Sequence, residues 1–289
     1  MFFKILRYDI RRGIIGSPKG HLLTVVLGLL ICVGFNFDYS KYYDIHTASF
    51  LDIIYYSFAG SPKYVPNKDL PFIFPLVWAT VFLLPIYMSS YYPFYDLMGY
   101  GKTILIETGS KKAWLLSKTV WCILRITVYF VLFYLTILIF CLVMEIPVDY
   151  CVTRNTHEMM IERYYKADVY LAGDYELLDF NGDKSILFLV LPVLIVSVIA
   201  MFQMTISLFS TPVYGFLVSA AILVVSTYYL HPALLGNYLM VLRSDQLFNG
   251  GVNELTGAIT SIILIIIVTK INLMSFRKYD ILANIFKDE

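Results

Sequence analysis

The sequence predicts an all-α membrane protein with six transmembrane helices, and three observations support this fold class. Hydrophobic residues make up 59% of the 289-residue chain and charged residues only 15%, whereas a soluble domain carries roughly 25% charged residues. Six apolar runs reach or approach the about 20 residues that a helix needs to cross a hydrocarbon core. Each run is apolar on all sides rather than along one stripe, which is typical of a membrane span and not of a surface helix.

The N-terminal residues 1–20 are expected to form an amphipathic helix that lies in the membrane interface. Phe3, Leu6, Ile10 and Ile14 recur at helical spacing, and basic side chains occupy the other faces. Such a helix places its basic side toward anionic lipid headgroups. A Gly-Ser-Pro break then separates it from the first span. We interpret it as an anchor that orients the chain, with direct contact to a partner as the alternative.

The six predicted spans lie near residues 22–37, 71–91, 119–144, 186–209, 213–230 and 255–276. The distribution of Lys and Arg sets the orientation, because cytoplasmic segments carry an excess of both. With both termini inside, twelve lysines and arginines fall in the inner segments and eight in the longer outer segments. The sequence therefore predicts a topology with the N-terminus and the C-terminus in the cytoplasm.

Three outer segments separate the spans within one transmembrane domain covering residues 1–289. Residues 38–70 are predicted to form an outer loop, and residues 145–184 a folded outer cap with a short helix around Glu158 and Glu162. The cap carries nine acidic and four basic side chains, which we interpret as a solvated surface; attraction of a cationic substrate is the alternative. Residues 231–254 are predicted to form re-entrant outer helices before the last span.

We single out three charged or strongly polar side chains inside the predicted spans: Arg125, Gln203 and Lys270. The two cations lie near predicted cytoplasmic ends, from which long basic side chains can extend to the headgroups. Gln203 is expected to hydrogen-bond to a neighbouring helix. A proton relay would need acidic residues inside the spans, and their absence from the sequence there counts against a proton-coupled transporter.

Two sequence patterns resemble catalytic motifs without completing them. Gly101-Lys102-Thr103 matches the end of a phosphate-binding loop, but the required glycine five residues earlier is Asp96. His157-Glu158 begins like a zinc-protease helix, yet the second histidine is replaced by Ile161. We therefore expect no nucleotide, metal or other cofactor in this chain, no catalytic residues and no nucleic-acid partner.

The connection between the second and third predicted spans, residues 91–118, is the most informative segment. It opens with aromatic residues, continues into a helix-like stretch with mixed charge, breaks at a Gly-Ser pair and ends with Lys118 before the third span. An amphipathic helix in such a connection is suited to dock into a groove of a soluble protein.

This segment resembles the permease subunits of type-2 ABC exporters. In that family an acidic residue, a glycine and a short helix follow the second span, and a basic pair precedes the third. The resemblance implies a multi-pass subunit in the plasma membrane of a bacterium. A second permease copy or homologue would pair with it. A separate ATP-binding cassette ATPase would bind ATP and Mg²⁺. The residues that the resemblance implies for contact with this ATPase are Asp96, Leu97, Gly99, Thr103, Leu105, Glu107, Lys111 and Lys112.

The resemblance further suggests export of an antimicrobial peptide, a drug-like amphiphile or a lipid-linked molecule. A single Asp stands where the family more commonly has Glu followed by Arg, and both long outer segments exceed the usual length, which leaves the substrate open. Two alternatives belong to other classes. The chain could be a membrane immunity or scaffold protein that binds a ligand with its outer loops, or a membrane-embedded enzyme.

Overall fold

The computed structural model describes residues 1–64, 72–164, 181–247 and 249–277, and these residues form helices with no β-strand among them. The α-helices are α1 (Phe2–Asp9), α2 (Pro18–Tyr39), α3 (Phe50–Phe58), α4 (Leu76–Ser90), α5 (Tyr92–Met98), α6 (Tyr100–Thr108), α7 (Lys111–Val143), α8 (Arg154–Tyr164), α9 (Leu187–Phe209), α10 (Pro212–Tyr228) and α11 (Glu254–Arg277). A π-helix, η1 (Ile10–Ile15), and three 3₁₀-helices, η2 (Ile45–Thr47), η3 (Leu235–Leu239) and η4 (Val241–Arg243), complete the described elements.

Four of these helices are long and apolar enough to cross a membrane: α2, α7, α9 and α11. The predicted all-helical fold is therefore confirmed for the described residues, with four helices that could span a membrane. The other two predicted spans correspond to shorter helices, α4 with 15 residues and α10 with 17 residues. The first residue of the second predicted span, residue 71, lies outside the described residues.

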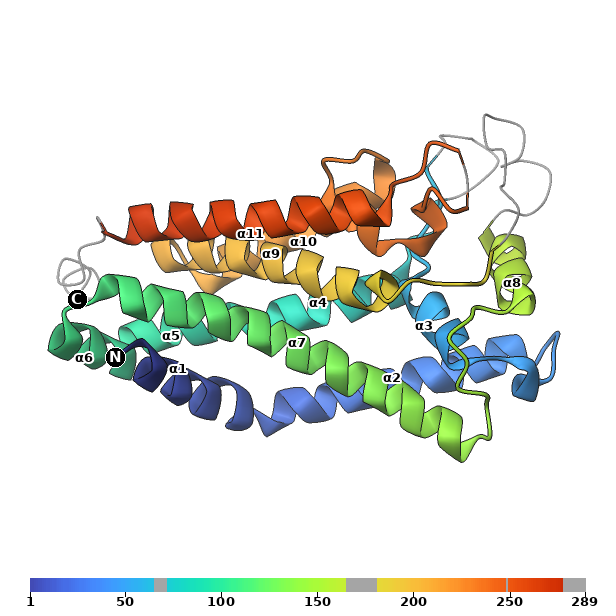
Figure 1. Ribbon diagram of the computed structural model, residues 1–289, viewed down its shortest axis with the longest axis horizontal. Helices are drawn as coiled ribbons and strands as arrows, with labels where there is room; N and C mark the ends of the chain where they lie inside the picture. Colours follow the sequence, from blue (N-terminus) through green and yellow to red (C-terminus); the bar gives the residue numbers. More distant parts are fainter. Residues whose placement is uncertain (65–71, 165–180, 248, 278–289) are drawn as a thin grey trace.

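The long helices pack around α9, which contacts α4, α7, α10 and α11, while α2 packs along the other side of α7 (Figure 1). One end of this bundle holds α1, α5 and α6, and we call it the α6 end. The opposite end holds α3 and α8, and we call it the α8 end (Figure 1). The last turn of α11 lies at the α6 end, because Phe276 belongs to the same buried apolar cluster as Ile5 of α1.

Tyrosine hydroxyls of α7 donate to backbone carbonyls close to the prolines inside α4 and α9. Proline cannot donate to the carbonyl four residues earlier, so Pro85 leaves the carbonyl of Val81 without its helical partner. The hydroxyl of Tyr129 in α7 donates to this carbonyl at 2.9 Å. Near Pro192 in α9, the hydroxyl of Tyr134 donates to the carbonyl of Leu189 at 2.9 Å. These bonds join α7 to α4 and to α9, where the alternative in a membrane would be unsatisfied polar groups.

The N-terminal segment is packed against the protein as well as being amphipathic. α1 packs on α7, with Ile5 and Asp9 buried, whereas the side chain of Phe3 is 79% exposed. After η1, the chain bends at Gly16 and Ser17, and α2 begins at Pro18, four residues before the predicted span. A purely interfacial helix would leave Asp9 in water, and the burial of this carboxylate indicates a specific partner inside the protein.

The described parts of the three segments that the sequence predicts outside the membrane pack against other helices. Within the predicted outer loop 38–70, α3 inserts between α2, α4 and α7 and buries nearly all of its residues. A capping box of Ser49 and Asp52 begins this helix, and its apolar sequence accounts for the burial. The short helix predicted around Glu158 and Glu162 is confirmed as α8. The segment predicted as re-entrant contains η3 and η4, and η3 packs against α9, α10 and α11.

Candidate functional site

The segment that the sequence assigns to ATPase coupling lies at the α6 end, where α5, α6 and the start of α7 follow one another closely (Figure 1). The predicted break after α6 is confirmed: Gly109 adopts a φ of 61°, a left-handed conformation that glycine reaches without strain. Ser110 then caps α7, because its hydroxyl accepts a hydrogen bond from the backbone N–H of Ala113 at 3.3 Å. This turn reverses the chain and leaves α6 as a short separate helix.

The structure divides the predicted coupling residues between the interior and the surface. Asp96, Leu97 and Leu105 are buried, Lys111 is half-buried, and Gly99, Thr103, Glu107 and Lys112 are exposed. The buried side chains attach the segment to the bundle, and the exposed ones are placed where a separate protein could reach them. The predicted set therefore contains residues of two different kinds.

A buried ion cluster joins three helices at this end. The Nζ atom of Lys118 in α7 lies 2.6 Å from Oδ2 of Asp96 in α5 and also donates to Oδ1 of Asp9 in α1. All three side chains are at most 1% exposed. The ammonium group lies 4.8 Å from the ring centre of Tyr92 and 5.0 Å from that of Trp114, within the range of cation–π attraction. Two carboxylates thus share one ammonium group in the protein interior.

Neutral donors complete the cluster around the two carboxylates. Oδ2 of Asp9 accepts from the Ser117 hydroxyl at 2.5 Å, and Oδ1 of Asp9 accepts from the Tyr92 hydroxyl at 2.9 Å. Oδ2 of Asp96 accepts from the indole N–H of Trp114 at 3.3 Å. Burial, together with the charges of Asp9 and Asp96, raises the pKa of Tyr92 well above its usual value, so this hydroxyl stays a donor. Such donors are needed because buried charges lose their hydration.

The first turn of α6 lies directly against Asp96. A Cβ atom at Gly101 would overlap the Asp96 carboxylate and come within 2.6 Å of its backbone carbonyl. Only glycine allows this approach. The second carboxylate oxygen, Oδ1 of Asp96, is buried and has no hydrogen-bond partner among the described residues. The position of α6 is therefore coupled directly to the ionic contacts of Asp96.

An apolar cluster surrounds the ion cluster and includes residues from six helices. Its members are Ile5, Leu97, Leu105, Trp114, Leu115, Met204, Leu208 and Phe276. The rings of Trp114 and Phe276 are stacked with their centres 5.1 Å apart. α1, α5, α6, α7, α9 and α11 thus meet in one packed region, so a displacement of α6 would be felt by all of them.

The solvent-exposed face of α5 and α6 carries apolar side chains beside polar ones. Tyr95 is 62% exposed, Tyr100 54% and Ile106 62%, and Thr103 and Glu107 are exposed on the same short helix α6. Large apolar side chains that are clustered on a surface mark sites of interaction with proteins or membranes. This face is the candidate contact surface of the molecule.

The three predicted intramembrane polar residues occupy different environments. Gln203 is buried and donates its amide to the Ile86 carbonyl at 2.9 Å, so the predicted hydrogen bond to a neighbouring helix is confirmed. Arg125 is 4% exposed and donates to the Ser17 hydroxyl at 3.3 Å, at the start of α2. It packs against protein there instead of extending along a lipid-facing surface. Lys270 is exposed on α11.

The sequence places Arg243 only among the basic residues of the predicted outer segments, but the structure buries this cation near the α8 end. Its side chain is 0% exposed. The guanidinium donates to the carbonyls of Ser61 at 2.8 Å, Pro62 at 3.0 Å and Thr227 at 2.6 Å. It also donates to the carbonyl of Ser226 and to Oδ1 of Asn237. An arginine at the end of the apolar run 232–242 was the available signal for this role.

A polar network joins α3 to the segment that precedes and begins α8. The buried carboxylate of Asp52 accepts from the backbone N–H and the hydroxyl of Thr153, both at 2.8 Å. Burial raises the pKa of Asp52, and these hydrogen bonds oppose the shift. The Tyr55 hydroxyl lies 3.1 Å from Nδ1 of His157. Burial, together with the nearby charge of Lys184, lowers the pKa of His157 to about 4. These contacts hold the start of the outer cap on the bundle.

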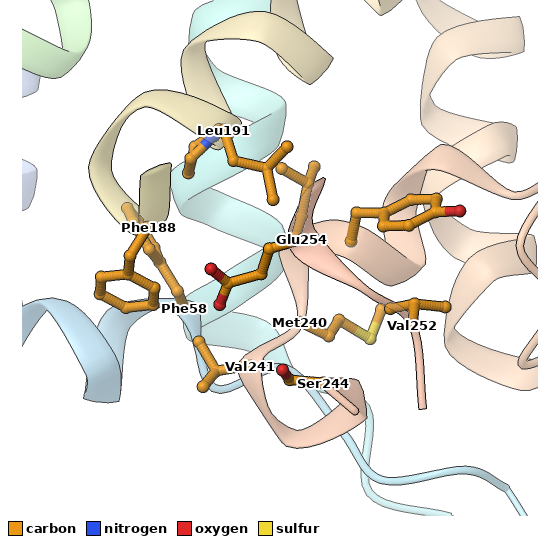
Figure 2. A pocket seen from close by; sticks show the side chains of 11 residues that line it. Phe58, Phe188, Leu191, Met240, Val241, Ser244, Val252 and Glu254 are labelled. Carbon is orange, nitrogen blue, oxygen red and sulfur yellow. The ribbon is translucent and has the colours of Figure 1, made fainter. Parts of the chain in front are cut away.

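A small cavity of about 20 Å³ lies between α3, the start of α9 and the segment around η3 and η4. Figure 2 shows the Glu254 carboxylate directed into it, among Phe58, Phe188, Val241 and Ser244. A cavity of this volume holds a single water molecule. It is therefore too small for an organic substrate in this conformation.

Known proteins do not extend these observations. No family model, no curated protein and no solved structure matches the chain. The resemblance of residues 91–118 to type-2 ABC permeases stays a prediction from the sequence. The candidate site consists of the ion cluster, the surrounding apolar cluster and the exposed face of α5 and α6.

Proposed function

We propose that this chain is the membrane-spanning permease subunit of an ATP-driven exporter. ATP would be hydrolysed by a separate ATP-binding cassette ATPase, and two permease chains would form the path for an amphiphilic substrate. An antimicrobial peptide, a drug-like amphiphile or a lipid-linked molecule fits this class. The observation that carries the proposal is an exposed short helix, α6, attached through a buried ion cluster to α1 and to the long helix α7.

Six membrane crossings with both ends in the cytoplasm fit the packing of the helices. Ile5 of α1 and Phe276 in the last turn of α11 belong to one apolar cluster. The N-terminal helix and the end of the last helix therefore lie at the same end of the bundle, as an even number of crossings requires. α10 has 17 residues and a length of about 26 Å. α4 has 15 residues and continues almost directly into α5. Helices somewhat shorter than the hydrocarbon core are accommodated by local thinning of the bilayer.

The contacts of α6 provide a physical route from an ATPase to the membrane. α6 lies against Asp96, Asp96 is paired with Lys118, and Lys118 is part of α7. α7 has 33 residues and a length of about 50 Å, enough to extend across the whole bundle. A partner that binds α6 differently in its ATP-bound and ATP-free states would shift the packing of these helices, in proportion to its difference in affinity for the two arrangements.

The sequence around α6 supports a separate source of ATP hydrolysis. Gly101, Lys102 and Thr103 lie inside the helix α6, with the short helix α5 immediately before it. A phosphate-binding loop instead wraps the phosphates with the amides of a glycine-rich turn between a strand and a helix. The partial motif thus has the wrong local structure for binding ATP.

Co-purification with an ATPase tests the proposal. The tagged chain is co-expressed in a bacterium with each cassette ATPase of its source genome in turn, extracted in mild detergent and reconstituted in nanodiscs. We expect a stoichiometric complex whose ATP hydrolysis responds to substrate. Ile106→Asp places a charge on the exposed face of α6 and should weaken the complex by about 30-fold or more, the effect of removing one interface hot spot.

Tyr42→Asp is the matched control, because Tyr42 is 63% exposed but follows α2 at the other end of the bundle. It should leave the complex unchanged. Equal complex formation by Ile106→Asp and by the unmodified chain would show that α6 is not the docking element. Ligand binding without any ATPase would instead support the immunity or scaffold alternative, and turnover by the isolated chain would support a membrane-embedded enzyme.

A further inference from the structure

A groove of about 510 Å³ lies at the α6 end, between the turn that joins α6 to α7 and the last turn of α11. Three cationic side chains line it, from Lys111, Lys112 and Arg277. Four apolar side chains, from Leu115, Leu273, Met274 and Phe276, also line it, and Gly109 and Ser110 complete the wall. No acidic side chain of the described residues lines this groove. A ligand that combines a negative charge with an apolar part would complement this lining.

The length of α11 leads us to expect the groove at the depth of lipid headgroups. α11 begins at Glu254 and has 24 residues, so its length of about 36 Å exceeds a hydrocarbon core of about 30 Å. Its last turn, which lines the groove, is therefore expected near the membrane surface. Met274, which lines the groove, is 72% exposed, and Ile271, one turn earlier on the same helix, is 49% exposed. An apolar chain leaving the groove would continue along this lipid-facing surface.

One of the three cations, Lys111, is held by a contact to the end of α11. Nζ of Lys111 donates to the backbone carbonyl of Arg277 at 3.4 Å, which links the start of α7 to the end of α11. Phe276 stacks on Trp114, which is itself packed against the ion cluster. The wall of the groove is thus continuous with the candidate site. Basic pockets between membrane helices commonly bind anionic lipid headgroups.

From these observations we infer that the groove binds one anionic phospholipid, with the phosphate between Lys111, Lys112 and Arg277 and an acyl chain along α11. Lys111 and Lys112, which the sequence assigns to ATPase coupling, would contact lipid instead. The bound lipid would join α7 to α11 at the point where both lie beside the coupling segment. Lipid binding at this site requires only that the chain lies in a membrane. The proposed lipid site therefore does not depend on the proposed ATPase partner.

Native mass spectrometry of the delipidated full-length chain tests this site. Phosphatidylglycerol and phosphatidylcholine, with the same acyl chains, are added separately, and the fraction of protein that retains one lipid is measured. We expect retention of phosphatidylglycerol. The variant Lys111→Gln/Lys112→Gln should bind it about 30-fold more weakly, because each basic residue contributes about fivefold to the binding of anionic lipid. Addition of inorganic phosphate should not displace the lipid, because phosphate lacks the acyl chain.

The matched control is Lys4→Gln/Lys19→Gln, which removes two exposed lysines from α1 and the start of α2 without touching the groove. It should bind phosphatidylglycerol as the unmodified chain does. Equal weakening by both double variants would mean that only general charge attraction operates, and displacement by inorganic phosphate would identify a site for a soluble anion. Either result overturns the proposal, as does equal retention of both lipids. If the double variant does not fold, Lys112→Gln alone, at an exposed position, should still weaken binding about fivefold.

Discussion

Two buried cations, one toward each end of the bundle, are held in chemically different ways. Lys118 at the α6 end is surrounded by the carboxylates of Asp9 and Asp96. Arg243 near the α8 end is surrounded by backbone carbonyls and the side-chain oxygen of Asn237. Both side chains are 0% exposed. The first arrangement joins separate helices through full charges, whereas the second joins them through fixed dipoles.

This difference has a mechanical consequence. Three of the carbonyls around Arg243, those of Ser226, Thr227 and Tyr229, lie at the C-terminal end of α10, where helix carbonyls lack internal partners and carry partial negative charge. The planar guanidinium can donate to several of them at once, which a lysine cannot do. This end is therefore expected to be rigid. An ammonium group between two carboxylates can instead exchange partners when a helix moves.

The largest effect is expected from Arg243→Met. At least four buried carbonyls would lose a donor, and each unsatisfied group costs about 1–3 kcal/mol. We expect the free energy of unfolding, measured by denaturant titration in detergent, to fall by more than about 4 kcal/mol. Arg243→Lys should recover only part of this loss, because it restores the charge but not the planar set of donors. Full recovery by lysine would show that charge alone holds this region together.

A somewhat smaller effect is expected from Lys118→Met, about 3–5 kcal/mol in the same measurement, because two buried carboxylates lose their cation. Here the charges themselves cause the loss. The triple variant Lys118→Met/Asp9→Asn/Asp96→Asn removes all three charges and should recover much of the stability. A triple variant no more stable than Lys118→Met alone would show that the cluster acts through hydrogen-bond geometry, as we expect for Arg243.

The helices were predicted from the sequence more completely than their contacts. Long apolar runs are a local property, and four of them are confirmed as membrane-length helices. The break at Gly109 and the short helix α8 were also predicted correctly from local signals. α3 was missed as a buried element, because a nine-residue apolar helix is too short to stand out as a span.

The segment that carries the candidate site was singled out from the sequence, but the buried contacts inside the site were not predicted. Lys118 and Asp96 were singled out by the family resemblance, but their partner Asp9 lies 87 positions before Asp96 and carries no local signal. Pairing between residues so far apart depends on how α1 packs, which periodicity does not reveal. The same reason applies to Arg243, whose carbonyl partners come from backbone groups that every residue possesses.

The smallest expected effect is a change in the free energy of unfolding with pH, which we expect from His157 near the α8 end. His157 near the α8 end has a pKa of about 4, lowered by burial and by Lys184, against about 6.5 in an unfolded chain. Between these values the unfolded chain binds a proton that the folded chain does not. Stability contributed by neutral His157 is therefore fully present above about pH 6.5 and is lost as the pH falls toward 4.

We expect this loss to reach about 1–3 kcal/mol over that range, measured as the free energy of unfolding at several pH values. His157→Gln can keep a hydrogen bond to Tyr55 but cannot titrate, so its profile should be flatter than that of the unmodified chain by this amount. His46→Gln is the matched control, since His46 is exposed in η2. It should leave the profile unchanged. Equal flattening by both variants, or by neither, would show that the acid sensitivity does not arise from His157.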